Sequence, residues 1–221
     1  NHDKAVGYEP LSESLGKLRE YYLYRQMVVR HRCSFEVRRG EKRLMMEKSA
    51  AKTVIAQSGK HIVSELNKEI AKIDKKIASL IESSYELSEV YKIVTSVPGI
   101  GTQNAVCLMV YTDNFRRFNY DARSIACYYG IAPFGKDSGA SVHVEPHVHH
   151  MANRHIKAML TQAALAAVRF NPSIAQYYQR LIGRGKKMPV AMNNVKNKLL
   201  HIVTSMVKNK QVYNPEHRFA A

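Results

Sequence analysis

Residues 63–80, "VSELNKEIAKIDKKIASL", decide the fold class of the first half of this chain. Large apolar side chains recur there at alternating spacings of three and four residues, the a and d rhythm of a helix with a narrow apolar seam. The positions between them are mostly Lys, Glu and Asp, so the rest of the helix surface is expected to face water. The sequence therefore predicts a long helical arm. Its seam positions are Val63, Leu66, Ile70, Ile73, Ile77 and Leu80.

The seam has two candidate partners, and the pattern alone does not choose between them. It could pack along its own neighbour in an antiparallel helical hairpin, or it could form a zipper with a second subunit. Ser84 takes an a position before Leu87, so the seam weakens toward its C-terminal end. The zipper would make the protein a homo-oligomer through the 63–87 heptad helix.

Upstream of the arm, the helical pattern begins at Leu11, after a connector at residues 1–10. A basic run at residues 30–44 is interrupted by Gly40, which predicts a break or bend. A second helix is then expected to begin near Glu41. We expect residues 1–92 to form the linker and helical arm, and residues 93–221 to form a compact domain.

That domain is expected to be helical, with a Gly- and Ser-containing connection in its middle. Residues 97–101, "VPGIG", separate two helical stretches, and "SVHV" at 141–144 alternates like a short strand. Helical patterns return over residues 152–170 and 190–208. The fold class is therefore mainly α: a long coiled-coil arm followed by a compact helical domain with a helix-hairpin-helix.

The charge balance indicates a polyanionic partner. Lys and Arg number 34 against 18 Asp and Glu, which gives a formal net charge of +16 and a pI near 9.8. Phosphate backbones are the usual partner of such an excess. Three cysteines without a C-x-x-C spacing indicate reduced thiols in a cytoplasmic protein, here near the nucleoid. The sequence shows no run long enough for a membrane span.

The turn "VPGIG" is the first candidate contact with nucleic acid. Glycines permit positive φ and leave backbone N–H groups free at a helix N-terminus, where a phosphate can bind. This is the sequence form of a helix-hairpin-helix, which binds DNA backbone without sequence preference. Pro98, Gly99 and Gly101 would form this contact, and Arg116 and Arg117 could extend it.

Two basic clusters are candidates for further contacts with phosphates. Arg154 and Lys157 are three residues apart and share one face of a helix. Arg184, Lys186 and Lys187 alternate with glycines in a loop. Such clusters set affinity and salt dependence rather than sequence choice.

One serine and one histidine-rich stretch are candidates for chemistry. Ser138 precedes Gly139 in an irregular connection, where a nucleophile would be accessible, although no base is close in sequence. Residues 143–155, "HVEPHVHHMANRH", contain five histidines, but Pro146 interrupts the strand and the spacing matches no known zinc pattern. We therefore expect no metal site in this chain.

Together these segments resemble the C-terminal domain of DEDD-type insertion-sequence transposases, the serine-bearing, bridge-RNA-guided recombinases related to Piv invertases. The likeness runs in order from about Tyr91 to Val207, and the upstream region resembles the family's linker and coiled coil. The "S-K-x-G-N" segment of the family corresponds to residues 149–153, where Ala152 replaces the usual glycine. The segments that carry the likeness are "SVPGIG" (96–101), "YYGIAPFGKDSGASV" (128–142), "HHMANRHIKAMLTQAALAA" (149–167) and "YYQRLIGRGKKMPVAMNNVKNKLLHIV" (177–203).

The resemblance implies a function and a missing part. Family members carry an N-terminal RuvC-like domain whose acidic residues hold divalent metal, expected to be Mg, and a C-terminal serine that attacks DNA. The matching serine here is Ser138, while the acidic motifs lie upstream of the matched region. We therefore expect the chain to be the C-terminal part of a longer transposase, inactive alone, with DNA and a guide RNA as partners. The alternative is a non-catalytic helix-hairpin-helix module that binds nucleic acid, or a degenerate transposase remnant.

Overall fold

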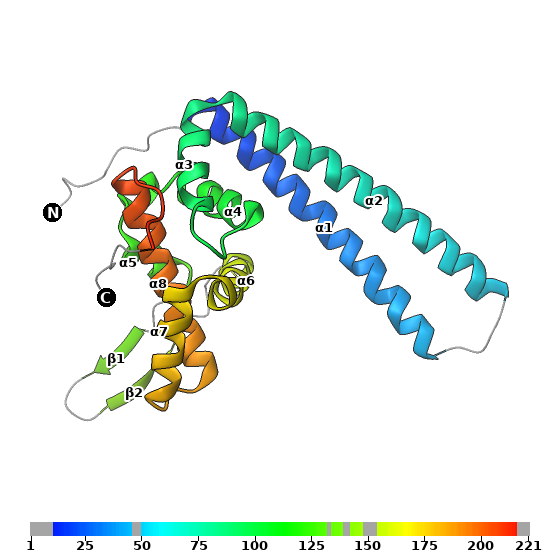
Figure 1. Ribbon diagram of the computed structural model, residues 1–221. Coiled ribbons are helices and arrows are strands. Elements are labelled where there is room, and N and C mark those ends of the chain that lie inside the picture. Colours follow the sequence, from blue (N-terminus) through cyan, green and yellow to red (C-terminus); the bar gives the residue numbers. More distant parts are fainter. Residues whose placement is uncertain (1–10, 46–49, 132–133, 139–141, 148–153, 216–221) are drawn as a thin grey trace. The chain divides into compact units, whose positions relative to one another are not determined.

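The computed structural model describes residues 11–45, 50–131, 134–138, 142–147 and 154–215, and it is mainly helical, as predicted. The chain divides into two compact units, residues 1–85 and 86–221. Unit 1 holds two long helices, and unit 2 holds shorter helices with one two-stranded sheet (Figure 1). The elements are α1 (Glu13–Met45), α2 (Ala50–Ser83), α3 (Tyr85–Thr95), α4 (Thr102–Thr112), η1 (Arg116–Phe118), α5 (Ala122–Tyr128), β1 (Phe134–Ser138), β2 (Val142–His147), α6 (Arg154–Phe170), α7 (Pro172–Gly183) and α8 (Met188–Lys208).

In unit 1 the predicted seam packs against its own chain. Helices α1 and α2 lie side by side and antiparallel (Figure 1). Val63, Ile70, Ile73 and Ile77 of the seam are buried, while Ile81 replaces the half-buried Leu80 at the next turn. The antiparallel hairpin is therefore the arrangement that covers the seam within this chain, and pairing of subunits through residues 63–87 stays a prediction.

The predicted break at Gly40 is wrong. Helix α1 continues through Gly40 to Met45, and the next helix begins at Ala50 rather than near Glu41. A single glycine inside a helix costs only about 1 kcal/mol relative to alanine. A helix of 33 residues that packs along a partner can absorb that cost, because each further residue adds a backbone hydrogen bond.

An ion pair joins α1 to α2. Arg25 Nε donates to Asp74 Oδ1 at 2.6 Å and Nη2 donates to Oδ2 at 3.1 Å, a two-point contact. The Arg25 side chain is only 14% exposed. Because a bidentate pair fixes geometry as well as charge, it favours one register of the two helices.

Replacing Arg25 with methionine is expected to lower the free energy of unfolding by about 1–2 kcal/mol, since Asp74 would lose the two Arg25 donors while remaining partly solvated. Urea titration followed by circular dichroism would measure this. Lys68, which is exposed and pairs with Glu65 one turn away on the same helix, provides the control. Lys68→Met should change stability by less than about 0.5 kcal/mol. Equal effects of the two substitutions would contradict a register role for Arg25.

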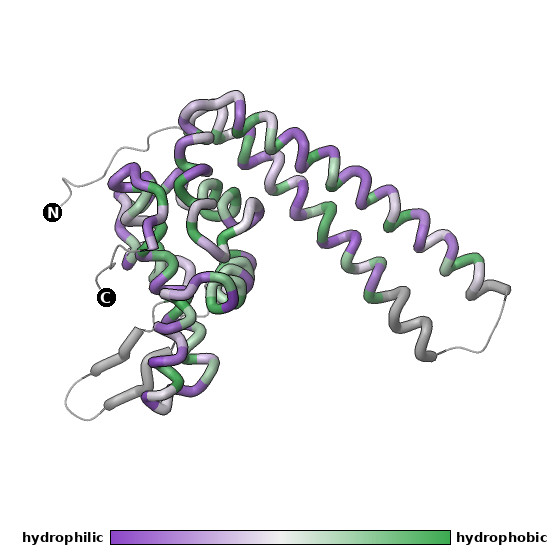
Figure 2. Tube along the Cα trace, in the orientation of Figure 1, coloured by the Kyte–Doolittle hydropathy of each residue, from purple (hydrophilic) through white to green (hydrophobic). Residues whose placement is uncertain are grey.

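The core of unit 2 forms around α4, α6 and α8. Residues 105–110 of α4 are all buried, and α6 and α8 contribute a row of buried alanines and aliphatic side chains. Figure 2 shows α4 as largely hydrophobic, whereas hydrophilic and hydrophobic positions alternate along the arm. Unit 2 therefore has a core of its own.

The middle connection of unit 2 contains a β-hairpin. Strands β1 and β2 pair antiparallel, with Phe134 opposite His147 and Ser138 opposite Val142. The strand expected around "SVHV" is confirmed as β2, but β1 was not predicted. The register is irregular between Phe134 and Lys136, whose partners His147 and Val144 are separated by Glu145 and Pro146. Proline has no N–H to donate to a strand ladder.

Candidate nucleic-acid interface

The VPGIG turn joins α3 to α4, as predicted, but its first glycine has a packing role. Gly99 has φ +104°, and a Cβ added there would lie 2.5 Å from the Cα and N of Ala167 on α6. Val97 and Ile100 beside it are buried. The backbone of Gly99 is thus in close contact with the backbone of α6, a contact that sequence reasoning missed.

The second glycine of the turn differs from the first. Gly101 is exposed and is the N-cap of α4, with φ −85° and no side chain that caps the helix. Pro98 is half-buried. The phosphate contact predicted for this turn therefore rests on Pro98, Gly101 and the first N–H groups of α4, and it stays a prediction.

The loop that follows α4 holds its backbone in an unusual conformation. Phe115 and Tyr120 have φ of 68° and 54°, in the left-handed region that costs a bulky side chain about 1–2 kcal/mol. Asp113, Asn114 and Asn119 share this conformation, although Asn and Asp adopt it more readily. Five left-handed residues therefore flank the short helix η1. Strain of this kind persists where the surrounding structure enforces it, and it is concentrated at functional sites.

Helix η1 carries the two predicted arginines, and they have different environments. Arg116 Nη1 lies 3.3 Å from Glu86 Oε1 on α3, so part of its charge is already neutralised. The Arg117 guanidinium lies 5.0 Å from the ring centroid of Tyr128 and carries no carboxylate partner in the described region. Of the two, Arg117 is the better candidate for binding a ligand.

The N-terminal turn of α6 brings cations from two helices together. Arg154 is exposed and Lys157 is half-buried, on the face predicted from their spacing. Lys196 of α8 is only 6% exposed, and burial lowers its pKa, with the nearby charge of Lys157 lowering it further. Of these cations, Arg154 is the exposed one and is therefore the candidate for a phosphate contact.

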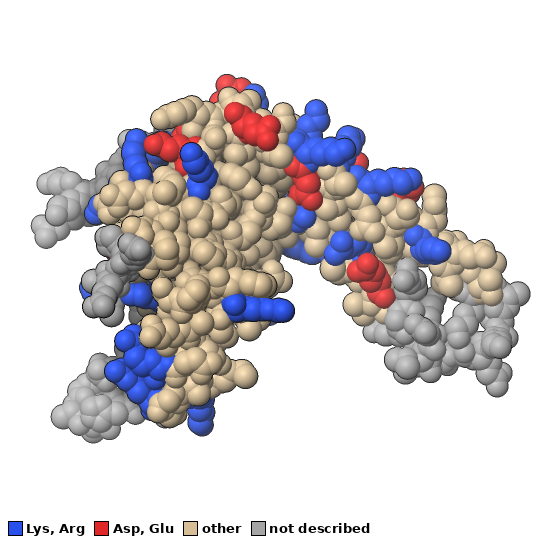
Figure 3. Space-filling model, in the orientation of Figure 1, with Lys and Arg blue, Asp and Glu red and all other residues tan. Residues whose placement is uncertain are grey.

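The turn between α7 and α8 presents the second predicted cluster. Arg184, Lys186 and Lys187 are all exposed there, and Gly185 allows the turn with φ +78°. Figure 3 shows Lys and Arg gathered at the end of unit 2 where α7 meets α8, with the acidic atoms of this unit on the same face at its other end. Unit 2 therefore has a basic end.

The basic end of unit 2 reflects a lack of acidic residues in the C-terminal part of the sequence, which the motif analysis missed. Residues 154–215, which include α6, α7 and α8, contain eleven Lys and Arg but no Asp or Glu. Lys210 pairs with Glu89 of α3 at 3.7 Å. Because these helices have no carboxylates of their own, their field is positive, as a polyanion-binding surface requires.

Ser138 lies in regular structure rather than in the irregular connection that we expected. It is the last residue of β1, opposite Val142 of β2. Its side chain, and residues 139–141, lie outside the described part of the structure. The connection to the helical core is fixed just upstream, where Asn193 Nδ2 of α8 donates to the Ile131 carbonyl at 2.6 Å.

The histidine-rich stretch is only partly described. His143 and His147 lie on β2, residues 148–153 are outside the described ranges, and His155 lies on α6 beside Tyr111, with ring centroids 6.2 Å apart. Within the residues that the structure describes, no three His, Cys, Asp or Glu side chains come together as a metal site would require.

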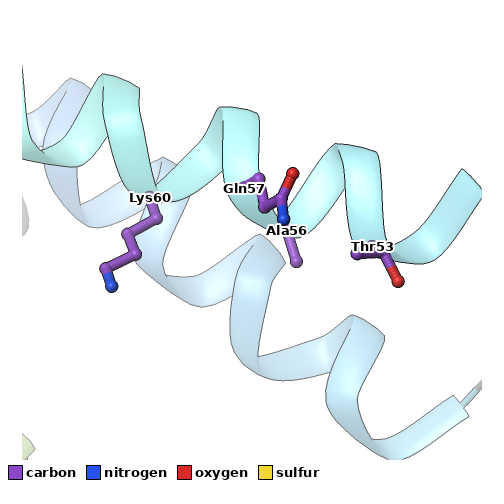
Figure 4. Close-up of a pocket in the computed structure, with 4 residues that line it drawn as sticks. All are labelled: Thr53, Ala56, Gln57 and Lys60. Carbon is purple, nitrogen blue, oxygen red and sulfur yellow. The ribbon is translucent and has the colours of Figure 1, made fainter.

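A shallow depression on the arm offers no alternative site. It lies along one side of α2 and is open to solvent (Figure 4). Its lining consists of Thr53, Ala56, Gln57 and Lys60, which include neither an acid–base pair nor a nucleophile with a base. The features of unit 2 therefore remain the candidates.

Comparison with known proteins found a likeness that covers the larger part of unit 2. Residues 91–179 match the transposase family IS116/IS110/IS902. The matched segment begins in α3, contains Ser138 and the loop around η1, and ends in α7. It includes most of the region in which the sequence resembles serine-bearing transposases.

Three curated relatives agree with this match. The chain is 29% identical over 133 residues to the insertion element IS110 uncharacterized 43.6 kDa protein of Streptomyces coelicolor, covering 60% of this chain and 32% of that protein. It is 23% identical over 146 residues to the pilin gene-inverting protein of Moraxella bovis, covering 66% and 45%. It is 26% identical over 163 residues to the insertion element IS900 uncharacterized 42 kDa protein of Mycobacterium paratuberculosis, covering 72% and 41%.

Two further facts bear on what the chain can do. It spans between about a third and just under half of the length of these relatives. Across the described helices, none combines the length and apolar character that crossing a membrane requires.

Proposed function

We propose that this chain is the serine-bearing, DNA-binding portion of a transposase that cleaves and transfers DNA strands. The observation that carries the proposal is the match of residues 91–179 to a transposase family, in a segment that contains Ser138. The acid-free helices of unit 2 support it, because they supply the positive field that a DNA backbone requires.

In the proposed reaction Ser138 is the nucleophile. Its Oγ gives up a proton to a base and forms a bond to a backbone phosphorus, while the bond from phosphorus to the 3′ oxygen breaks and that oxygen leaves as a hydroxyl. A free 3′ hydroxyl of the exchanged strand then attacks the phosphoserine and restores the serine. Each step exchanges one phosphate ester for another, so the phosphodiester energy is conserved.

The cations of unit 2 would hold the strand during these steps. Arg154 and Lys157 on α6, and the turn at residues 184–187, are proposed to contact backbone phosphates. Arg117 and the N-terminus of α4 would extend this surface. Phosphate contacts position the strand and carry no sequence information, so we propose that target choice lies with a guide RNA.

Three further parts of the proposal lie beyond the described residues. Developing charge on phosphorus requires stabilisation, and divalent metal, proposed to be Mg, would supply it. We propose that a RuvC-like domain of the longer protein, which the family resemblance implies, supplies the acidic residues that would hold this ion. A homo-oligomer is proposed because two duplexes need at least two nucleophiles, and the cytoplasm is the proposed compartment.

A covalent adduct tests the proposal. The transposase that contains this chain, incubated with Mg and DNA spanning the ends of its own element, should give a protein–DNA species that survives denaturation. Ser138→Ala should abolish that species, a loss of at least about 1,000-fold given the weight of a nucleophile, while binding is retained. The 221-residue chain alone should bind DNA without forming an adduct.

Ser205 offers a matched control, since it is an exposed serine on α8, and Ser205→Ala should leave the adduct unchanged. If Ser138→Ala forms the adduct in normal yield, Ser138 is not the nucleophile. Binding without any adduct from either protein would instead favour the non-catalytic nucleic-acid module.

A further inference from the structure

The strained loop between α4 and α5 is held in place by the core. Phe115 is fully buried, and its N–H donates to Thr112 Oγ1 at 2.9 Å. Asn114 Nδ2 donates to Glu86 Oε1 at 3.0 Å, and Arg116 pairs with the same carboxylate at 3.3 Å. Buried and polar anchors therefore keep the backbone in its left-handed conformation, so η1 is presented in one orientation.

The loop places a cation over an exposed aromatic ring. The Arg117 guanidinium lies 5.0 Å from the Tyr128 ring centroid and 5.7 Å from that of Phe118, and Nη2 lies 3.4 Å from the Tyr128 hydroxyl. Tyr128 is 49% exposed. The side chain is thus both ordered and open to a ligand.

The Tyr128 ring packs against two further aromatic rings, those of Phe118 and Tyr129. Phe118 lies 5.3 Å from it at a tilt of 55°, and Tyr129 lies 5.0 Å from it at 80°. Tyr129 is fully buried, and its hydroxyl donates to the Tyr111 carbonyl at 2.5 Å. Such edge-on contacts restrict the Tyr128 ring, so binding a flat ligand to it would cost little side-chain entropy.

We propose that Arg117 and Tyr128 form a stacking platform for one unpaired nucleobase of the bound nucleic acid. An ordered aromatic face can bind a nucleobase by stacking, and a guanidinium beside it can bind the phosphate of the same nucleotide by charge. Both groups lie here on a positively charged domain. Bases inside a duplex are stacked on each other, so the platform selects single-stranded segments. The inference rests on the proposed function, because strand exchange is the stage at which unpaired bases arise.

Binding of single-stranded DNA to the 221-residue chain tests the platform. A fluorescent 12-nucleotide oligothymidylate and a duplex of equal length would be titrated by polarisation. Tyr128→Ala should weaken binding of the single strand about 5- to 150-fold, the range for loss of one stacked base. Tyr128→Phe retains the ring and should bind within about twofold of the original, and duplex affinity should not change.

Three further measurements separate stacking from a general effect of losing a tyrosine and from misfolding. Tyr85→Ala removes another tyrosine that is 83% exposed, and it should leave both affinities unchanged. A 2-aminopurine base in the oligonucleotide should be quenched on binding the original and Tyr128→Phe, but not on binding Tyr128→Ala. Melting temperatures confirm that each variant is folded.

The alternatives are distinguishable in the same assays. Three outcomes would contradict the platform. Tyr128→Ala could lose single-strand and duplex affinity equally, or its affinity could be unchanged. The third outcome is that the original chain binds only the duplex. Ser138→Ala should bind the oligonucleotide as the original does. If no adduct forms but Tyr128→Ala still loses affinity for the single strand alone, the nucleophile assignment is refuted and the platform is still supported.

Discussion

Gly99→Ala is expected to lower the free energy of unfolding by about 2–5 kcal/mol. Left-handed backbone costs alanine about 1–2 kcal/mol, and overpacking a tight contact adds about 1–3 kcal/mol. The new Cβ would meet the Cα and N of Ala167 at 2.5 Å, and backbone atoms of a helix cannot rotate away as a side chain can. Urea or thermal unfolding followed by circular dichroism would measure the loss.

Gly101→Ala is the matched control in the same turn. Gly101 has φ −85°, and a Cβ there would meet nothing within 4 Å. We expect a change in stability within about 0.5 kcal/mol. Ala167→Gly should not rescue Gly99→Ala, because the contact is with the backbone of α6. A stable Gly99→Ala variant with reduced DNA affinity would show instead that this glycine serves phosphate binding.

Neutralising the basic turn between α7 and α8 should have the largest effect on DNA binding. Replacing Arg184, Lys186 and Lys187 together with glutamine removes three exposed cations from a region that has no carboxylates. Each phosphate contact contributes about −0.9 to the slope of log affinity against log salt, so the slope should become shallower by about 2.7. At about 0.1 M salt this corresponds to a loss of about two to three orders of magnitude in affinity.

The same charge change on the arm provides the comparison. Lys60, Lys75 and Lys76 are exposed on α2, and their replacement with glutamine should shift affinity by less than about tenfold through the loss of net charge. Duplex DNA titrated at several salt concentrations by polarisation would separate the two triple variants. Equal slopes for both would contradict a specific phosphate-binding role of the α7–α8 turn.

Local patterns predicted much of this structure. The spacing from Val63 to Ile77 predicted a long helix with one buried face, and α2 has both. "SVHV" predicted β2, and the flanking apolar periodicity predicted α6 and α8. Each of these features depends on residues within a few turns of each other, so the periodicity of the sequence is enough to find them.

Features that depend on distant residues were missed. Gly40 looked like a break because its propensity is local, whereas α1 continues through it. Tyr128 carried no signal in the sequence, since its partner Arg117 is brought to it by a left-handed loop that neither glycine nor proline marks. The absence of acidic residues from 154–215 was visible in the sequence, and counting charges by segment would have found it.

The sequence by itself determined that this protein is helical, carries a long arm and has a strong positive charge, because these properties follow from composition and short-range spacing. Only the tertiary structure decided that α1 covers the seam of α2, that Gly99 packs against the backbone at Ala167, and that Arg117 lies over Tyr128. Each of these three contacts depends on the path of the folded backbone, which local periodicity does not specify. A glycine that allows a phosphate to approach the backbone and a glycine that allows a helix to pack against it look alike in the sequence. Only the tertiary structure shows which group lies beside the glycine.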